Sequence, residues 1–199
     1  KTFTVTQFES EDKIELSMKS NKADNLKKQN TQSYQNHLYT LLHLMSPIHP
    51  PKLELTENDT KEVAHFTGRY DIEDKLIIGI NTGAGARWRY KRWGVAQTIH
   101  LIDSLRDEYP DATVLLFGGK EEQQRNQFIL NNVRTNVIVC DTSKSLRQFI
   151  GLLSICDILV TSDSLALHIA TAFDIRIVAF FGPTSATEIE LFGKGTKII

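Results

Sequence analysis

The sequence lacks the features that mark several large classes of protein. No run of about 18 apolar residues occurs, so the sequence predicts no membrane-spanning helix. The formal net charge is only −1, whereas nucleic-acid-binding proteins usually carry a basic surface. We therefore expect neither a transmembrane segment nor a nucleic-acid partner.

Cysteine is also scarce. The two cysteines, Cys140 and Cys156, lie in apolar stretches and do not have the spacing of metal ligands. In the reducing cytosol such residues are usually buried free thiols. We therefore expect a cytoplasmic protein whose cysteines are reduced and bind no metal.

Two common phosphate-binding motifs are missing. The glycine-rich segment 82–85 is not followed by the Gly-Lys-Ser/Thr of a Walker A loop, and Trp88 interrupts the GxGxxG pattern of dinucleotide-binding proteins. The chain begins at Lys1, with neither an initiator Met nor a signal-peptide pattern. From this start we expect the chain to be a piece of a longer protein.

The first third of the chain predicts a small α+β segment. Alternating apolar and polar residues over 3–18 predict a two-stranded hairpin, and apolar residues at helical spacing predict a helix over 34–45. Thr56 with Asp59 resembles a capping box that opens a second helix. Residues 68–74 are interpreted as a linker.

From Leu76 onward the pattern becomes regular. Apolar runs of strand length alternate with helical patterns, which predicts a parallel sheet covered by helices on both faces. We expect strands over 76–80, 113–117, 136–140, 158–161 and 175–181, and helices over 95–105, 121–132, 146–153 and 166–173. The predicted fold class is α/β, a Rossmann-like parallel sheet preceded by the small α+β segment.

Two of these helices have an expected inward face. Phe128 and Ile129 are expected to point toward the sheet from the helix over 121–132. In the next helix, four apolar residues fall at i, i+3, i+4 and i+7, which predicts one continuous buried face. These residues are Leu146, Phe149, Ile150 and Leu153.

One edge of the predicted sheet has an unusual composition. Small and hydroxyl-bearing residues concentrate in the loops that follow strands, as in 81–85, 118–119, 161–164 and 182–185, whereas the opposite edge has connections such as 108–111. Ligands of open parallel sheets bind beyond the carboxyl ends of the strands. The asymmetry therefore predicts a binding edge.

The loop after the first strand carries features of an anion site. Gly83 and Gly85 let the backbone approach an anion closely, and Thr82 adds a hydroxyl donor. Lys91 and Arg92 follow and supply positive charge suited to a diphosphate. The alternative is a glycine-rich turn with solvated cations.

The loop after the fourth strand offers further candidates. Ser164 is placed to cap the next helix, whose first-turn N–H groups would point into the crevice. Asp163 suits backbone amides or a ligand hydroxyl, and His168 is either a phosphate donor or a histidine satisfied within the protein. Glu121 and Glu122 are interpreted as solvent-facing acids at a helix start, although one of them would suit a ribose diol.

Taken in order, these segments resemble the C-terminal half of glycosyltransferase family 9, the ADP-heptose:lipopolysaccharide heptosyltransferases. The resemblance covers about residues 76–193. It rests on Thr82-Gly83-Ala84, Lys91-Arg92-Trp93, Gly118-Gly119 with Glu122, Ser145-Leu146, Asp163-Ser164 with His168-Ile169-Ala170, and Phe181-Gly182-Pro183-Thr184.

The resemblance implies roles for individual residues. A nucleoside diphosphate gains charge as it leaves the sugar, and fixed amides with a lysine stabilise that charge without a metal or other cofactor. The implied contacts are Thr82, Gly83 and Lys91 at the donor diphosphate, Glu122 (or Glu121) at the ribose, and Asp163, the amides of Ser164 and Leu165, and His168 around the phosphates and sugar.

The resemblance also implies a division of the chain. Family members have two facing Rossmann-like domains (the GT-B architecture), and the C-terminal one holds the donor. Residues 71–199 would be this domain, and residues 1–70 a remnant of the acceptor domain with the linker. The catalytic base is expected upstream of Lys1, so we expect this chain to bind nucleotide without turnover.

Two positions depart from the family pattern. Leu165 stands where Gly commonly follows Asp-Ser, and Gly94 stands where Pro commonly follows Lys-x-Trp. These departures leave the donor sugar open, although the resemblance implies ADP-heptose.

The leading hypothesis is a glycosyltransferase that moves heptose or a related sugar from a nucleotide-diphosphate donor to lipopolysaccharide or another cell-envelope glycan. We expect a cytoplasmic protein that can associate peripherally with the inner membrane. One alternative is a non-catalytic nucleotide-binding or interaction module. Another is a sugar-nucleotide epimerase, which would need further acids, for which Glu188 and Glu190 are the candidates.

Overall fold

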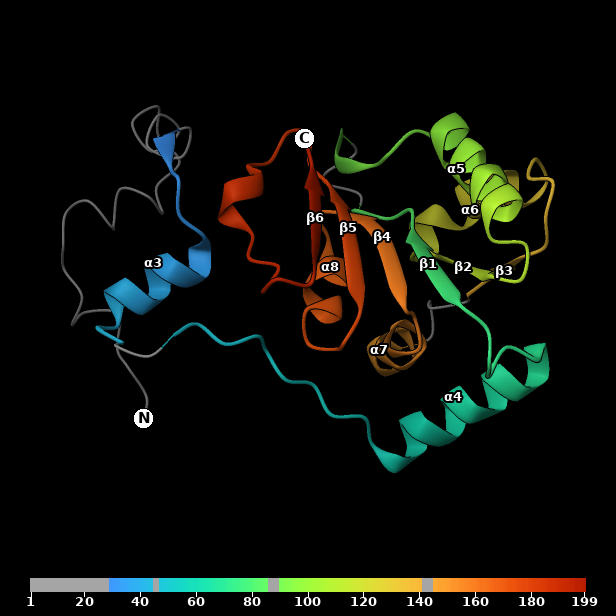
Figure 1. Cartoon of the computed structure of the whole chain (residues 1–199), viewed down its shortest axis with the longest axis horizontal. Coiled ribbons are helices and arrows are strands. Elements are labelled where there is room, and N and C mark those ends of the chain that lie inside the picture. Colours follow the sequence, from blue (N-terminus) through green and yellow to red (C-terminus); the bar gives the residue numbers. More distant parts are fainter. Residues whose placement is uncertain (1–28, 45–46, 86–89, 141–144) are drawn as a thin grey trace. The chain divides into compact units, whose positions relative to one another are not determined.

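The structure is a computed structural model in which residues 29–44, 47–85, 90–140 and 145–199 are described, Leu41 by its backbone only (Figure 1). The chain divides into a smaller unit, residues 1–49 with 185–190, and a larger unit, residues 50–184 with 191–199. The predicted hairpin over 3–18 lies outside the described residues.

The smaller unit contains helix α3 (Tyr34–Leu41) and the short 3-10 helix η4 (Ala186–Glu188). Ser33 caps α3, because its Oγ accepts a hydrogen bond from the Asn36 N–H at 3.2 Å. The predicted helix over 34–45 begins where expected but ends early. His43 has a φ of 52°, a left-handed conformation that does not continue a helix.

Helix α4 (Glu57–Tyr70) opens the ordered part of the larger unit, and its predicted capping box is confirmed. The Asp59 carboxylate accepts from the Thr56 N–H at 2.7 Å, while Thr56 Oγ1 accepts from the Asp59 N–H at 3.2 Å. The predicted linker over 68–74 is wrong in its first three residues, which are helical. The helix ends at Asp71, whose φ of 54° is left-handed.

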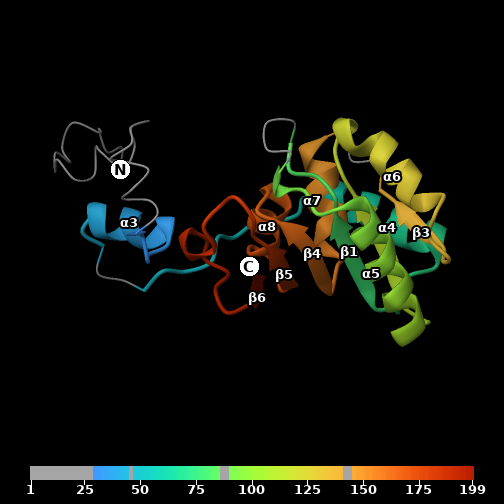
Figure 2. The same ribbon diagram turned by 90° about the horizontal axis from the view of Figure 1, so that it is seen from above.

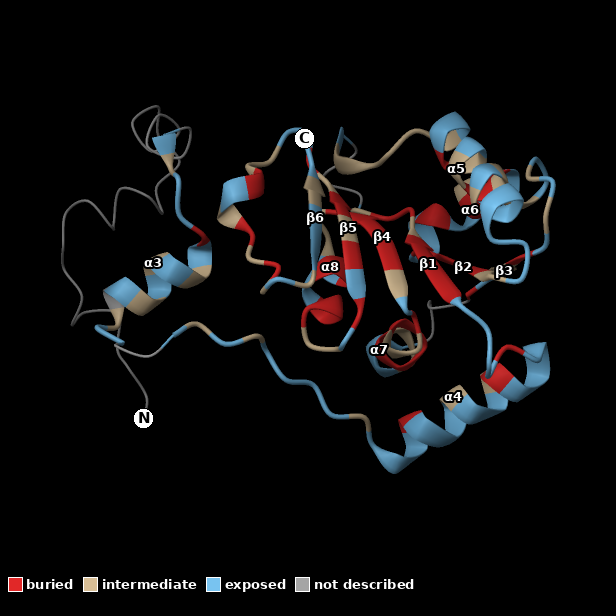
Figure 3. Cartoon of the chain, viewed as in Figure 1, coloured by how far each residue is buried: buried red, intermediate tan, exposed pale blue. Residues whose placement is uncertain are grey.

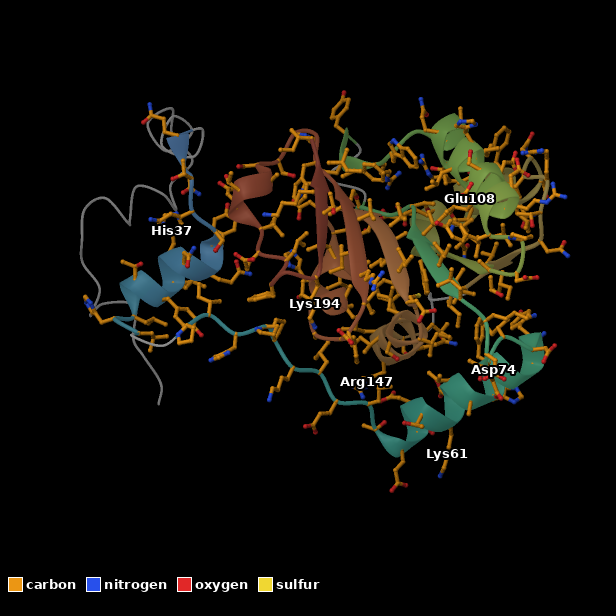
Figure 4. The ribbon with its side chains drawn as sticks, viewed as in Figure 1. His37, Lys61, Asp74, Glu108, Arg147 and Lys194 are labelled. Carbon is orange, nitrogen blue, oxygen red and sulfur yellow. The ribbon has the colours of Figure 1, made fainter. Side chains whose placement is uncertain are left out.

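Helix α4 packs against α7 (Leu146–Ser154) within the larger unit. Arg147 forms an ion pair with the buried Asp59 and donates to the Glu54 carbonyl at 3.1 Å (Figure 4). The compact units divide between His49 and Pro50, while the division into an acceptor remnant with linker (1–70) and a donor domain (71–199) stays a prediction.

The larger unit is built on a six-stranded sheet in which every neighbouring pair of strands is parallel. The order is β3-β2-β1-β4-β5-β6 (Figures 1 and 2). The strands are β1 (Ile77–Asn81), β2 (Thr113–Phe117), β3 (Val137–Val139), β4 (Ile158–Ser162), β5 (Arg176–Phe180) and β6 (Gly195–Ile198). The predicted parallel α/β sheet is thus confirmed, and its strand order reverses between β1 and β4.

Strand β6 was not predicted from the sequence. It pairs with β5 at the edge of the sheet, and its residues Gly195, Thr196 and Lys197 do not form an apolar run. An edge strand buries only part of its surface, so it leaves little hydrophobic signal.

Helices cover both faces of the sheet. On one face, α5 (Val95–Glu108) and α6 (Gln123–Leu130) contribute Ile102 and Ile129 to a core cluster with Ile80, Leu116 and Val160 of the strands. On the other face, α7 packs against α8 (Leu165–Ala170), and α8 packs on β4 and β5. Buried residues accordingly concentrate in the strands, while the outer sides of α4 and α5 are exposed (Figure 3).

The predicted inward orientation is wrong for two residues, Phe128 and Leu146. Phe128 is 57% exposed, whereas its neighbour Ile129 is fully buried as predicted. The predicted helix over 121–132 consists of η3 (Lys120–Glu122) followed by the eight residues of α6, and only one side of α6 meets the sheet. Leu146 is 56% exposed, because it is the first residue of α7, while Ile150 and Leu153 are buried as predicted.

Both cysteines are free and buried, as predicted, and burial raises the pKa of each thiol. Within the described ranges, none of the helices combines the length and the apolarity needed to cross a lipid bilayer.

Candidate functional site

A cavity of about 570 Å³ lies at the carboxyl ends of β1, β2 and β4. This is the point where the strand order reverses, and open α/β sheets bind their ligands in such a crevice. The cavity is lined by Asn81, Gly83, Ala84, Gly85, Gly118, Gly119, Lys120, Glu121, Glu122, Leu146, Phe149, Ser164, Leu165 and Ala166.

The last residue of β1 joins two of the loops around the cavity. The Asn81 side-chain amide donates to the Gly83 carbonyl at 2.9 Å and to the hydroxyls of Thr161 and Ser164, each at 3.1 Å. These bonds tie the β1 loop (residues 82–85) to the loop after β4. Asn81 was not a sequence candidate, although its place between an apolar run and a glycine-rich loop is a usable signal.

Thr82 lies beneath the cavity and not on its wall. The residue is 5% exposed, and its Oγ1 lies 3.1 Å from the Phe117 carbonyl and 2.5 Å from Asn126 Oδ1. Its N–H also donates to the Phe117 carbonyl. Thr82 therefore anchors the β1 loop to β2. Asn126 was not predicted, and a polar residue inside a polar helix gives no signal of such a role.

The β2 loop (residues 118–119) leads into η3 and brings a carboxylate to the cavity. Glu122 is only 3% exposed, so its expected solvent-facing position is wrong, whereas Glu121 is exposed as expected. Glu122 Oε2 accepts from the Gly119 N–H at 3.0 Å. A Cβ at Gly118 would lie 2.7 Å from the Glu122 Cβ, so only glycine allows this approach.

Three ionisable residues lie close together, one of them Asp163, which directly precedes the cavity-lining Ser164. Lys91 Nζ lies 2.6 Å from Asp163 Oδ2, and both side chains are largely buried. His168 Nε2 is 3.9 Å from Asp163 Oδ1, and its side chain is 49% exposed, which contradicts the alternative of a satisfied internal histidine. The structure thus brings together three of the predicted site residues, and it forms an ion pair that the sequence did not suggest.

Ser164 and Leu165 follow Asp163 in the chain and belong to the cavity wall. Ser164 occupies the N-cap position of α8 as predicted, but its hydroxyl forms no capping bond and instead contacts Asn81 and Thr161. Leu165 is 56% exposed and lines the cavity.

The remaining wall is apolar. Leu146 and Phe149 of α7 line it opposite the glycine loops, and the Phe149 ring packs edge-on against Phe117 with centroids 5.9 Å apart. The sequence placed Leu146 and Phe149 in the core. A helical stripe alone cannot separate a core face from a cavity wall.

Among the residues that the structure describes, no group of three or more His, Cys, Asp or Glu side chains is placed to hold a metal ion. Independence from metal stays a prediction. The cavity and its neighbours offer a cation, a half-exposed histidine, a carboxylate and an apolar wall. Together these suit a ligand with an anionic group, hydroxyls and a flat apolar part.

A second hollow of about 580 Å³ lies between α4 and α7. Its walls are helix side chains, many of them charged, together with Ser145. Glu188 and Glu190, the candidate acids of an epimerase, belong to the smaller unit, whereas the residues that line both hollows belong to the larger unit.

Comparison with known families gives one match over most of the chain. The model of glycosyltransferase family 9 (heptosyltransferase) matches residues 10–199. Among curated relatives, lipooligosaccharide heptosyltransferase 2 of Campylobacter jejuni (serotype O:6) is 33% identical over 121 residues, or 57% of this chain and 36% of that protein. Lipopolysaccharide heptosyltransferase 2 of Escherichia coli K12 is 28% identical over 71% of this chain and 40% of that protein.

Solved structures agree on the fold. A family 9 glycosyl transferase from Veillonella parvula has a TM-score of 0.76 at 19% identity, covering 85% of this chain and 49% of that one. The E. coli ADP-heptose LPS heptosyltransferase II has a TM-score of 0.67 at 26% identity, covering 79% and 48%. The chain therefore spans less than half the length of each relative named here.

Proposed function

Because the chain belongs to glycosyltransferase family 9, we propose that its cavity binds the nucleoside diphosphate of a sugar donor. The observation that carries this proposal is the position of the cavity at the β1–β4 reversal, with the buried Glu122 on its wall and the Lys91-paired Asp163 directly before the wall residue Ser164. The chain would supply the donor-binding half of a heptosyltransferase-like enzyme.

Charge favours one orientation of the nucleotide. A carboxylate only accepts hydrogen bonds, so Glu122 or Glu121 suits the ribose hydroxyls and repels phosphate. Lys91 and His168, which lie beside Asp163, carry N–H donors and suit the diphosphate. The apolar wall of Leu146 and Phe149 would then receive the base.

The same groups account for the chemistry of the leaving group. As the acceptor hydroxyl attacks the anomeric carbon, the bond from that carbon to the diphosphate breaks and its electron pair stays on the phosphate oxygen. Lys91 would stabilise this charge after exchanging Asp163 for the phosphate, so no metal is required. Thr82 and Asn81 would act by fixing the β1 loop, and Gly83, Ser164 and Leu165 by forming the wall.

The finer assignment follows from the relatives' names. We propose ADP-heptose as the donor and a lipopolysaccharide or related cell-envelope glycan as the acceptor, for a cytoplasmic enzyme that associates peripherally with the membrane. The catalytic base would lie in the part of the relatives that this chain does not span.

Calorimetry with ADP, UDP, GDP and CMP tests the proposal directly. ADP is expected to bind most tightly, and no transfer is expected when this chain is given a sugar nucleotide and a glycolipid. Equal affinity for all four nucleotides, or binding of none, would overturn the donor assignment. Turnover by this chain would overturn the assignment of the base.

A further inference from the structure

Two arginines that the proposed reaction does not use flank the buried carboxylate of the cavity. Arg92 follows Lys91 in the chain, and Arg125 lies on α6 one turn beyond Glu122. The Arg92 side chain is 19% exposed and that of Glu122 is 3% exposed. The Nε atoms of both arginines are buried and have no hydrogen-bond partner among the described residues. Such burial of charge needs a structural reason.

Arg92 connects the two glycine-rich loops. Its Nη2 donates to the Gly85 carbonyl at 3.2 Å, which belongs to the β1 loop. The same nitrogen lies 2.8 Å from Glu122 Oε1, at the end of the β2 loop and η3. One guanidinium group thus spans two loops whose sequence positions are far apart.

Glu122 contacts both glycine-rich loops. Its Oε2 accepts from the Gly119 N–H at 3.0 Å, and a Cβ at Gly83 would lie only 3.1 Å from the carboxylate. The carboxylate therefore packs directly against the β1 loop while closing the turn of the β2 loop. A rotation of Glu122 would release both loops.

Arg125 holds the backbone next to Arg92 in place. It donates to the carbonyl of Trp93, the residue after Arg92, and the Trp93 ring stacks on Phe180 with centroids 4.5 Å apart. Burial and the nearby charge of Arg92 lower the pKa of Arg125, while Glu122 opposes this. Glu122 thus forms an ion pair with Arg92, and its charge also acts on Arg125.

We propose that Arg92 is a positioning residue, which holds the Glu122 carboxylate and the two glycine loops in the arrangement that receives the ribose of the nucleotide. This inference rests on the proposed function. Arg92 acts through Glu122 and need not touch the ligand. The Lys91–Asp163 pair does not include Arg92, so the diphosphate end should be insensitive to the loss of Arg92.

A ratio of affinities tests this role, because a general loss of stability does not change it. In the unaltered 199-residue chain, ADP is expected to bind about tenfold to a hundredfold more tightly than 2′-deoxy-ADP, the range for a hydrogen bond to a charged group. In Arg92→Gln the ratio should fall below about threefold, and Glu122→Gln should behave alike. In the double variant the ratio of affinities should fall no further than in either single variant, since both substitutions remove the same contact.

Three further variants act as controls. Arg134→Gln removes another ion-paired arginine, which contacts Asp103 and Asp107 away from the cavity, and it should leave the ratio unchanged. Arg92→Lys keeps the charge without the planar fork and should give an intermediate ratio. Lys91→Ala should weaken both nucleotides equally. A ratio preserved in Arg92→Gln would overturn the inference.

A measurement without nucleotide separates this inference from the proposed function. Amide hydrogen exchange at Gly119 should accelerate in Arg92→Gln and not in Arg134→Gln, because Arg92 holds the carboxylate that binds the Gly119 N–H. Unchanged exchange would overturn the role of Arg92 in fixing the loops. If the unaltered chain bound no ADP while exchange still accelerated, the proposed function and the ribose role would fall and the loop-fixing role would stand.

Discussion

The two hollows of the larger unit have nearly equal volumes, about 580 Å³ between α4 and α7 and about 570 Å³ at the strand ends. The first is walled by side chains of two helices, including the ion-paired Asp59 and Arg147. The second is walled largely by loops, with four glycines and a buried carboxylate. Volume therefore does not distinguish them, whereas chain topology and exposed backbone do.

The comparison has a physical basis. Surface charges on helices pair with one another or with water at little net free energy. At the strand ends, Gly85 and Gly119 are exposed, and charged groups are held in fixed positions by internal bonds. We therefore expect substitutions at the strand-end cavity to change ligand affinity and substitutions in the α4–α7 hollow to leave it unchanged.

The largest expected effect contrasts Lys91, whose partner Asp163 adjoins the strand-end cavity, with Lys61, which lines the α4–α7 hollow. Lys91→Ala should weaken ADP binding by about 1.5–3 kcal/mol, because the phosphate loses a charged donor and meets an unpaired Asp163. Lys61→Ala, in the α4–α7 hollow, should leave the affinity unchanged. Calorimetry measures both affinities, and an equal loss of ADP affinity in the two variants would contradict the assignment of the nucleotide to the strand-end cavity.

A glycine in each region gives the next contrast. Gly118→Ala places a Cβ 2.7 Å from the Glu122 Cβ and 2.8 Å from Asn126 Nδ2, so it should destabilise the fold by about 1–3 kcal/mol and weaken ADP binding. Gly68→Ala, in α4, meets only Glu73 Oε1 at 3.8 Å and should stabilise the helix by about 0.5–1 kcal/mol. Urea unfolding curves give both values, and destabilisation by Gly68→Ala would contradict this packing.

The cap of α4 should affect stability alone. Thr56→Ala removes the hydroxyl that accepts from the Asp59 N–H, which costs about 0.5–2 kcal/mol for an N-cap. ADP affinity at a temperature where both proteins are folded should not change. A fall in affinity equal to that of Lys91→Ala would show that α4 reaches the nucleotide site.

The smallest effect is a pH dependence in the α4–α7 region. The hydrogen bond to Arg147, with those from Thr56, lowers the pKa of Asp59 from 3.8 to about 2. Because the folded pKa lies below the unfolded one, the ionised Asp59 stabilises the fold above about pH 4, and this contribution is lost as the pH falls toward 2. Unfolding midpoints should therefore drop over this window in the unaltered protein and less in Arg147→Gln.

Much of the larger unit could be predicted from the sequence because local signals are strong there. The strand over 113–117 and the start of α5 at Val95 are as expected, since buried parallel strands are continuous apolar runs. β6 could not be predicted because an edge strand leaves little hydrophobic signal, and the exposure of Phe128 could not because it depends on which side of α6 meets the sheet.

The cavity was predictable in location but not in its internal contacts. Loop composition identified Gly83 and Ser164, and the family resemblance implied Glu122; all three line the cavity. The pairing of Glu122 with Arg92 joins residues from different β/α units, so no local pattern encodes it. The burial of Glu122 follows from that pairing, and for this reason the sequence assigned it to solvent.

The walls of the cavity come from four separate stretches of chain, 81–85, 118–122, 146–149 and 164–166. They meet only when β1, β2 and β4 lie side by side, so an unfolded chain offers the nucleotide no comparable site. Binding and folding are therefore linked. A nucleotide present at one hundred times its Kd should add about 2.7 kcal/mol to the free energy of unfolding, which makes the thermal midpoint a direct measure of occupancy.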